Sequence, residues 1–266
     1  MKIKFLLSLA VILILFSCSR DSVSGTDSSQ TNYFPLALRN YWKYRVLTNA
    51  ITQTDSLYVS NDTTINNKVY KKFKTRNTPI GFFSNSMNKN AARIDGDKIL
   101  LTGSIGFNFG SALPLNLSIN DYTIFQESAS NNQDLGSVSG SINQTVQNYP
   151  LTINYTLKST NIESLPTYSS NGQVYTDVKK IKTVLNAKIT TSLTVAGIPF
   201  PVVVTILDQQ DVVTSYQYYS KTIGMVYTNT TISYRLNSLP GGATLPLPSS
   251  GSQTQEEFLQ NYDVSH

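Results

Sequence analysis

The feature that most constrains this chain is an alternation of apolar and polar residues that runs through much of its length. Every second position is apolar from Trp42 to Val46 and from Leu151 to Leu157. A period of two places successive side chains on opposite faces of a β-strand, so each segment predicts a strand with one buried face. The best helical candidate, Gln255 to Leu259, is too short to be stable alone. We therefore expect an all-β, antiparallel domain.

Turn signals between the alternating segments predict local hairpins. Asn61-Asp62 and Asn66-Asn67 suit two-residue turns because asparagine tolerates left-handed backbone, and Asp95-Gly96-Asp97 separates two apolar segments. From Gly103 to Gly140, frequent glycines and polar residues favour long connections around one strand at Tyr122 to Phe125. Long loops on a β scaffold often carry binding residues.

The first 17 residues have the pattern of a secretory signal. Lys2 and Lys4 precede an apolar segment of twelve residues, Phe5 to Phe16, whereas a helix needs about 20 residues to cross a bilayer. We expect a signal helix that is removed, followed by a single domain. Its size fits one large all-β unit, either a strongly curved half-barrel or a two-sheet sandwich. Leu259 to Val264 is predicted as a last edge strand.

The end of the signal, Leu15-Phe16-Ser17-Cys18, resembles the lipobox of bacterial lipoproteins. The resemblance implies that the Cys18 sulfur receives a diacylglyceryl group, that cleavage occurs before Cys18, and that the new amino group is acylated, with palmitate-type chains. Several acyl chains hold a protein stably on a membrane. Cys18 is the only cysteine, so the chain forms no internal disulfide.

Residues 18–32 are predicted to form a flexible tether before a β domain at 33–266. Ser, Asp, Thr, Gly and Gln dominate this segment, a composition that buries too little surface to fold. Residue 19 is Ser, whereas Asp at that place retains enteric lipoproteins in the inner membrane, so the resemblance implies the outer membrane. Either the periplasmic face or the cell surface fits this prediction.

Two segments of the domain resemble known motifs. Tyr33 to Val46 is similar to the opening of Bacteroidota-type outer-membrane lipoproteins, a YFPL-x-x-G-N-x-W-x-Y pattern, with Arg39 in place of the glycine. We expect the turn at Arg39 to be built differently, because glycine suits a positive φ. Tyr216 to Tyr227 resembles a strand-turn-strand of lipoprotein-carrier-like half-barrels, with Gly224 at the bend. This second likeness favours the curved sheet.

Few residues are available for catalysis or metal binding. The only histidine is His266, and a last residue is usually frayed, which disfavours nucleophilic sites that depend on His. Zinc sites are disfavoured too, because the implied acyl group occupies Cys18, the only cysteine. Four of the acidic residues lie in turn-like contexts, where Asp bonds locally: Asp62, Asp95, Asp97 and Asp121. We predict no metal site and no cofactor.

Basic residues are scattered, and the formal net charge is +5. Lys72, Lys74 and Arg76 share one face of a predicted strand, as do Lys180 and Lys182, which favours solvated strand faces over a polyanion site. No basic motif is interleaved with stacking aromatics, so nucleic acid is an unlikely partner. The only tryptophan, Trp42, favours a core role over a sugar-stacking platform.

Together these features predict a membrane-anchored lipoprotein of the cell envelope with a non-enzymatic binding or structural role. Its partners would be the membrane, through Cys18, and an apolar, glycan or protein ligand whose binding residues the sequence does not identify. The alternative is a surface hydrolase that uses a pair of carboxylates. Inward-facing Asp or Glu in one deep cleft would favour the enzyme, and an apolar or Tyr-lined groove would favour binding.

Overall fold

A computed structural model describes residues 31–49, 51–109, 113–146, 148–194, 199–239 and 248–265. The predicted signal helix, Cys18 and His266 lie outside these residues. Within them, twelve strands and one helix follow one another along the chain. In chain order they are β1 (Tyr41–Thr48), β2 (Ile51–Ile65), β3 (Lys68–Thr75), α1 (Phe82–Met87), β4 (Ala91–Asp95), β5 (Lys98–Phe109), β6 (Leu113–Gln126), β7 (Gln133–Val146), β8 (Tyr149–Ser170), β9 (Gln173–Leu193), β10 (Val202–Ser220), β11 (Gly224–Arg235) and β12 (Ser250–Asp263).

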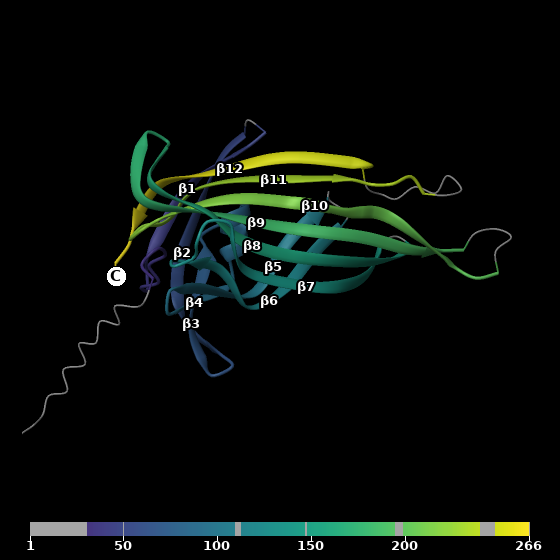
Figure 1. Ribbon diagram of the computed structural model, residues 1–266, viewed down its shortest axis with the longest axis horizontal. Helices are drawn as coiled ribbons and strands as arrows, with labels where there is room; N and C mark the ends of the chain where they lie inside the picture. The colour runs from purple at the N-terminus through teal and green to yellow at the C-terminus, as the bar shows by residue number, and fades with distance from the viewer. Residues whose placement is uncertain are drawn as a thin grey trace, which may run out of the picture.

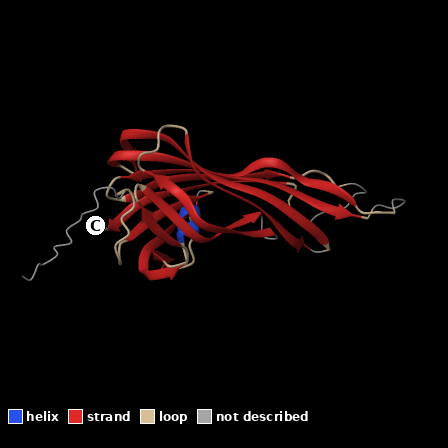
Figure 2. Cartoon of the chain, turned by 60° about the horizontal axis from the view of Figure 1, so that its bottom comes forward, coloured by secondary structure: helices blue, strands red, loops and turns tan. Residues whose placement is uncertain are grey.

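The strands form a single antiparallel sheet in the order β6-β5-β4-β3-β2-β1-β12-β11-β10-β9-β8-β7. The sheet curls until it nearly closes on itself, and α1 lies inside the curl (Figures 1 and 2). Ser159 Oγ of β8 donates a hydrogen bond of 2.5 Å to the Thr123 carbonyl of β6, which links one edge strand to the neighbour of the other edge strand, β7. The all-β, antiparallel prediction is confirmed, in its curved form rather than as a two-sheet sandwich.

The first and last strands pair with each other at the middle of the sheet. Trp42 of β1 lies opposite Tyr262 of β12, and β11 pairs with the other side of β12. The prediction of an edge strand at Leu259 to Val264 is therefore wrong, because β6 and β7, from the middle of the chain, form the edges. Gln255 to Leu259, which is too short for an independent helix, belongs to β12, and its alternate residues are buried.

Two predicted turns are correct and one is wrong. Asn66 and Asn67 have φ of 50° and 61° and connect β2 to β3, and Gly96 with φ of 58° connects β4 to β5. Asn61-Asp62 instead lies inside β2, next to an irregularity in the pairing with β3. A β-bulge accommodates the residues that resemble a turn in the sequence.

The region from Gly103 to Gly140 is not a set of long connections. β5, β6 and β7 cover most of it, and in β6 every second residue from Leu113 to Ile119 is buried. Gly103 and Gly106 lie within β5, and Gly136 and Gly140 lie within β7, so glycines that are typical of loops hid the alternation in the sequence. At Gly136 an added Cβ would stand 3.0 Å from the Thr123 carbonyl oxygen, so a small residue lets strands approach there.

The interior is filled where β1 begins and β12 ends, which we call the closed end. Phe34 lies at its centre, with ring centroids 5.0 Å from Trp42 and 5.4 Å from Phe73. Phe83 of α1 joins the same cluster and reaches within 6.2 Å of Phe34. The sequence predicted no helix here, since a helix this short shows no repeat. Helix α1 exists because the surrounding sheet supplies its contacts.

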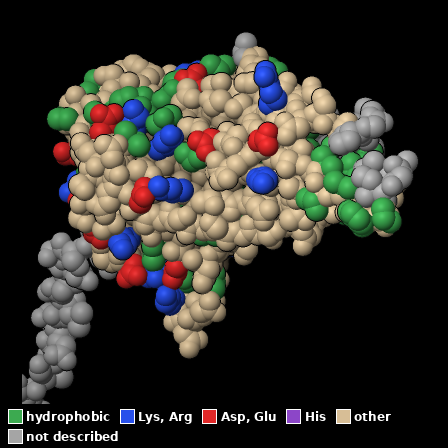
Figure 3. Space-filling model, turned by 45° about the vertical axis from the view of Figure 1, so that its right-hand side comes forward, with side chains coloured by type: hydrophobic (Ala, Val, Ile, Leu, Met, Phe, Trp, Pro, Cys, Tyr) green, Lys and Arg blue, Asp and Glu red, His purple; other side chains and the backbone are tan. Residues whose placement is uncertain are grey.

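At the opposite end, which we call the open end, the long strands β8 to β11 project beyond the filled interior (Figure 1). Hydrophobic side chains gather at this tip (Figure 3). The first residues of β10 and the turn before it contribute to it, with Phe200 65% and Val203 69% exposed. Elsewhere on that face, charges of both signs are sparse and interspersed (Figure 3). None of the described residues form a helix of the length and hydrophobicity that a membrane span requires.

Candidate functional site

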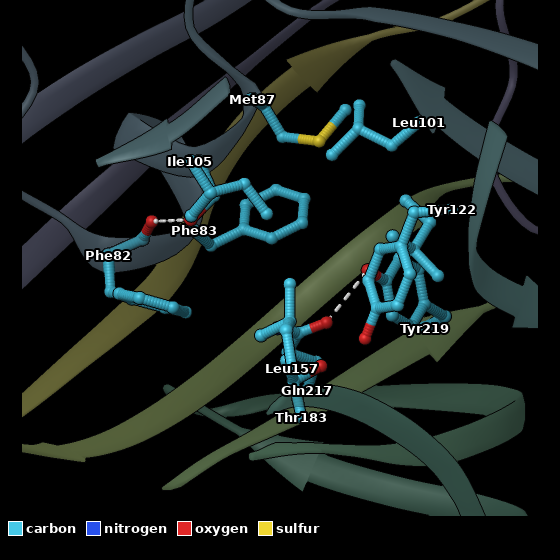
Figure 4. Close-up of a pocket in the computed structure, with 12 residues that line it drawn as sticks. Phe82, Phe83, Met87, Leu101, Ile105, Tyr122, Leu157, Thr183, Gln217 and Tyr219 are labelled. Atoms are coloured by element: carbon cyan, nitrogen blue, oxygen red, sulfur yellow. Dashed lines mark hydrogen bonds between the residues drawn. The ribbon is translucent and has the colours of Figure 1, made fainter. Parts of the chain in front are cut away.

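The interior of the curled sheet has little room for a ligand. Aromatic and aliphatic side chains from α1, β5, β6 and β10 converge on one cavity (Figure 4). Its volume is about 30 Å³, the space of a single water. The Tyr219 hydroxyl donates to Gln217 Oε1 at 3.0 Å along its wall. This cavity is too small for an acyl chain or a sugar.

Two buried carboxylates hold the start of α1. Glu257 is fully buried and accepts hydrogen bonds from Phe83 N at 2.6 Å, from Ser84 N at 3.2 Å and from Ser84 Oγ at 2.7 Å. Asp55, 3% exposed, accepts from Ile80 N at 3.0 Å and from Gly81 N at 2.7 Å. The first turn of a helix leaves backbone N–H groups without partners, and these carboxylates satisfy them.

Burial raises the pKa of both groups. Desolvation raises the pKa of Glu257 to about 7, against the hydrogen bonds from Ser84 and Phe83, which lower it. It also raises the pKa of Asp55, opposed by the N–H groups of Gly81 and Ile80. This pair is the kind of inward-facing carboxylate cluster that a hydrolase would need. Here it is sealed within the core and engaged by backbone donors, so no substrate reaches it in this conformation.

An open groove of about 750 Å³ lies on the outside of the molecule, beside α1. Four parts of the chain form it: the end of β3 with the segment after it, the outer side of α1 with its C-terminal turn, β5, and β6. Nearly all of its side chains are amides, hydroxyls or amines. The lining residues are Lys74, Thr75, Asn77, Thr78, Pro79, Asn85, Asn88, Lys89, Asn90, Gly103, Ser104, Gly106 and Asn116. We call it the amide groove.

Some of the lining residues form hydrogen bonds that fix the shape of the groove. Asn90 is buried, donates to the carbonyls of Ser86 and Ser104 at 2.7 Å each, and accepts from Ser104 N at 2.8 Å. The Asn88 side chain accepts from Thr75 N at 3.1 Å. Gly103 has φ of 141°, and an added Cβ would stand 2.0 Å from Asn90 Oδ1. The floor is therefore a rigid backbone surface that only glycine allows at residue 103.

The remaining polar groups face solvent. Asn85, Asn116, Lys74 and Lys89 are exposed, and their side chains have no hydrogen-bond or ion-pair partner within the described parts of the chain. An amide offers both a donor and an acceptor, which matches a hydroxyl group, and an ammonium offers donors to an anionic oxygen. None of the described residues around the groove is Asp, Glu, His or Cys. The groove is thus equipped to bind polar molecules, with the two lysines as its titratable side chains.

The structure places the acidic residues that the sequence assigned to turns in different surroundings. Asp95 and Asp97 flank the predicted turn at Gly96. Asp62 lies within β2 and forms an ion pair of 2.6 Å with Lys71 of the neighbouring strand β3. Among the described residues, no group of three or more His, Cys, Asp or Glu is arranged to hold a metal ion.

Asp121 is the centre of an ion-pair network that the sequence did not indicate. It accepts two hydrogen bonds from Arg93, at 2.9 and 3.0 Å, one from Lys68 at 2.8 Å and one from the Tyr70 hydroxyl at 2.7 Å. These donors hold the pKa of Asp121 well below its usual range. The network joins β3, β4 and β6, so we assign it a structural role.

The predicted basic clusters divide between two settings. Lys74 and Arg76 are exposed, as a solvated face requires, and Lys72 is half-buried. Lys180 forms an ion pair of 3.1 Å with Glu163 and lies 5.3 Å from the ring centre of Tyr216, near which Lys182 also lies. Lys180 is therefore engaged in contacts across the strands.

The two motifs that resemble lipoprotein segments pack against each other. Trp42 is fully buried, as predicted for a core residue, and its Nε1 donates to the Ile223 carbonyl at 2.6 Å. Gly224 has φ of 109°, and an added Cβ would lie 2.8 Å from Phe34 Cδ2. The expectation of a differently built turn at Arg39 is wrong, because Arg39 adopts φ of 74°, the conformation that glycine favours. Both motifs therefore form core contacts, and neither lies in the amide groove.

Comparison with known proteins adds one structural likeness. No family model matches the chain, and no curated protein matches it. A crystal structure of a "putative lipoprotein" from Parabacteroides distasonis aligns with a TM-score of 0.40 and 10% identity, covering 88% of this chain and 99% of that one. A likeness at this level does not establish a shared fold or function.

Proposed function

We propose that this chain is a lipid-anchored protein of the outer membrane that binds a glycan in the amide groove and catalyses no reaction there. The anchor is Cys18, and the support for it is the signal and lipobox pattern of residues 1–18. Residues 18–32 join the anchor to the sheet. The ligand is a polyhydroxylated molecule, and a glycan with acidic groups fits best.

The observation that carries the proposal is the chemistry of the amide groove. It is open and about 750 Å³ in volume, large enough for several sugar units, whereas the interior cavity has a volume of only about 30 Å³. Exposed amides of Asn85 and Asn116 supply donors and acceptors for sugar hydroxyls, and Lys74 and Lys89 supply positive charge for a carboxylate or phosphate substituent. The fixed backbone floor at Gly103 lowers the ordering cost of binding.

Two features support a binding role over hydrolysis. A glycoside hydrolase needs two carboxyl groups flanking the bond to be cleaved. The described lining of the amide groove contains no acidic residue, and the two carboxylates that do approach each other, Asp55 and Glu257, are buried under α1. These observations favour binding without chemistry.

The binding part of the proposal is tested by titrating the chain from residue 18, with Cys18→Ala, against soluble neutral and acidic glycans. Two lost hydrogen bonds should weaken binding about tenfold in Asn85→Ala/Asn116→Ala. Asn154→Ala is the matched control, since Asn154 is exposed on β8 outside the groove. Glycan binding that the control weakens equally, or no binding to any glycan, would overturn the assignment.

The anchor is tested separately by cell fractionation and by mass spectrometry of the N-terminal peptide. The expected result is an acylated Cys18 as the first residue and loss of the protein from the outer-membrane fraction in Cys18→Ala. An unmodified Cys18 in a membrane-bound protein would contradict the anchor and leave the groove assignment standing.

A further inference from the structure

A second hollow lies at the closed end of the molecule, on the outer face of β1 and β2. Two adjoining depressions of about 240 and 270 Å³ share Tyr41, Tyr58 and Arg76. Lys43 lines the first and Arg39 lines the second. Tyr41 and Tyr58 are direct partners across the two strands, so both side chains lie on the face that carries the two depressions. We call these five residues the basic groove.

The charges of the basic groove are available to a ligand. Arg39, Lys43 and Arg76 are exposed, and none of them has an ion-pair partner in the described parts of the chain. The neighbouring strands add one charge of each sign: Lys74 opposite Tyr58 in β3, and exposed Asp263 opposite Tyr41 in β12. Positive charge therefore predominates around the two depressions.

The backbone holds one of these cations in an unfavourable conformation. Arg39 adopts φ of 74°, which a residue with a Cβ adopts at a cost of about 1 to 2 kcal/mol. Its N–H donates to the Val59 carbonyl at 3.0 Å, and the neighbouring Asn40 side chain binds both Pro35 O and Ser265 O. The turn is thus fixed by its surroundings, and it presents Arg39 at the rim of the groove. Strain of this kind is common where a side chain serves a ligand.

The basic groove also lies near the membrane if the chain is anchored. The described chain begins and ends at the closed end (Figure 1), and Arg39 follows Thr31 by eight residues. The polar composition of residues 18–31 predicts an unfolded tether, and a tether of this length would span about 20 Å and keep this end within reach of the headgroups. Arginine forks and tyrosine hydroxyls both donate hydrogen bonds to phosphate oxygens.

We propose that the basic groove binds the phosphate of an anionic lipid headgroup in the bilayer that holds the anchor, and so orients the domain on the membrane. This inference takes its bilayer from the anchoring proposed above, but the contact itself needs no acyl chain. Each cation near an anionic surface strengthens binding about fivefold, and salt weakens that attraction.

The test uses the chain from residue 18 with Cys18→Ala, which removes the acyl group, and measures co-sedimentation with vesicles. Vesicles of phosphatidylcholine with phosphatidylglycerol should bind the protein in a salt-sensitive manner, and vesicles of phosphatidylcholine alone should not. Lys43→Ala should lower the partition coefficient about fivefold, and Arg39→Ala/Lys43→Ala/Arg76→Ala about a hundredfold. Lys188→Ala, an exposed lysine of β9, is the control of equal charge and should change nothing.

Three results would overturn the proposal: equal binding to both kinds of vesicle, an equal loss in Lys188→Ala, or full displacement by inorganic phosphate at concentrations that do not act through ionic strength. The last would identify a site for soluble phosphate instead. Asn85→Ala/Asn116→Ala, the amide-groove variant, should bind vesicles normally. Failure of the glycan assignment and failure of the headgroup contact are therefore distinguishable.

Discussion

The closed end and the open end of the sheet are built from the same alternating strands, yet only the open end carries an exposed apolar tip. At the closed end Phe34 and Trp42 are fully buried, and α1 completes the packing. At the open end Phe200 and Val203 are more than half exposed. Between these ends the strands cover one another, since Leu113, Ile153 and Leu207 are fully buried. Alternation therefore determines the strands, and an apolar strand face becomes core only where other side chains cover it.

Removing a large side chain should have the greatest effect at the closed end. Phe34→Ala is expected to lower the free energy of unfolding by about 3 to 5 kcal/mol, because it leaves a cavity among packed aromatic rings. Phe200→Ala, the same change at the open end, should cost less than about 0.5 kcal/mol. Denaturant unfolding measures both. Equal losses would show that the two ends are packed alike.

Adding one methyl group compares a packed with an open position at two glycines of positive φ, both at the closed end. Gly224→Ala should destabilise by about 3 to 4 kcal/mol, since its Cβ would stand 2.8 Å from Phe34 and 3.0 Å from Trp42. At Gly172, with φ of 78° and nothing within 4 Å of the added atom, the cost should be about 1 kcal/mol of backbone strain. Thermal melts of the two variants that shift equally would refute the close packing at Gly224.

The closed end should also give stability a dependence on pH. The pKa of Glu257 rises from 4.5 in the unfolded chain to about 7 in the folded one, and that of Asp55 rises too. Folding therefore takes up protons in this window, so stability is fully present below about pH 4.5 and falls as pH rises to 7, by about 3 kcal/mol. Urea unfolding at pH 5, 6 and 7 measures it.

Glu257→Gln is the control for that pH series. It removes the titrating group, so it should flatten the dependence while lowering stability at pH 5, because an amide cannot accept from both N–H groups and the Ser84 hydroxyl. An unchanged slope would assign the dependence to other groups.

A small effect, of opposite sign, is expected at Arg39. Arg39→Gly should raise stability by about 0.5 kcal/mol, the relief of left-handed strain less the extra chain entropy of glycine. The same variant should weaken vesicle binding if the basic groove serves a headgroup. A destabilised Arg39→Gly would show that the arginine side chain, rather than the turn, holds this part of the structure.

The sequence predicted what local patterns determine. The alternation at Leu151 to Leu157 and the turn at Asn66-Asn67 appear in the structure as expected. The strands between Gly103 and Gly140 were missed because glycines that permit close strand approach look like loop residues. Helix α1 was missed because Asp55 and Glu257, far away in the chain, supply its hydrogen bonds.

The candidate sites were less accessible to sequence reasoning. The amide groove brings Asn85 of α1 and Asn116 of β6 into one lining, and no local pattern in the sequence records that arrangement. The sequence does not single out Asn90 either, because its burial and its bonds to Ser86 and Ser104 are visible only in the structure. Trp42, which attracts attention as the only tryptophan, belongs to the core instead.

The measurement that tests the account most directly is native mass spectrometry of the chain, expressed with Cys18→Ala behind a cleavable export signal in its own periplasm. The account predicts a stoichiometric polyhydroxylated ligand on the protein, absent from Asn85→Ala/Asn116→Ala and retained by Asn154→Ala. A protein without ligand, or an apolar lipid that remains bound in the groove variant, would contradict the assignment of the amide groove as the functional site.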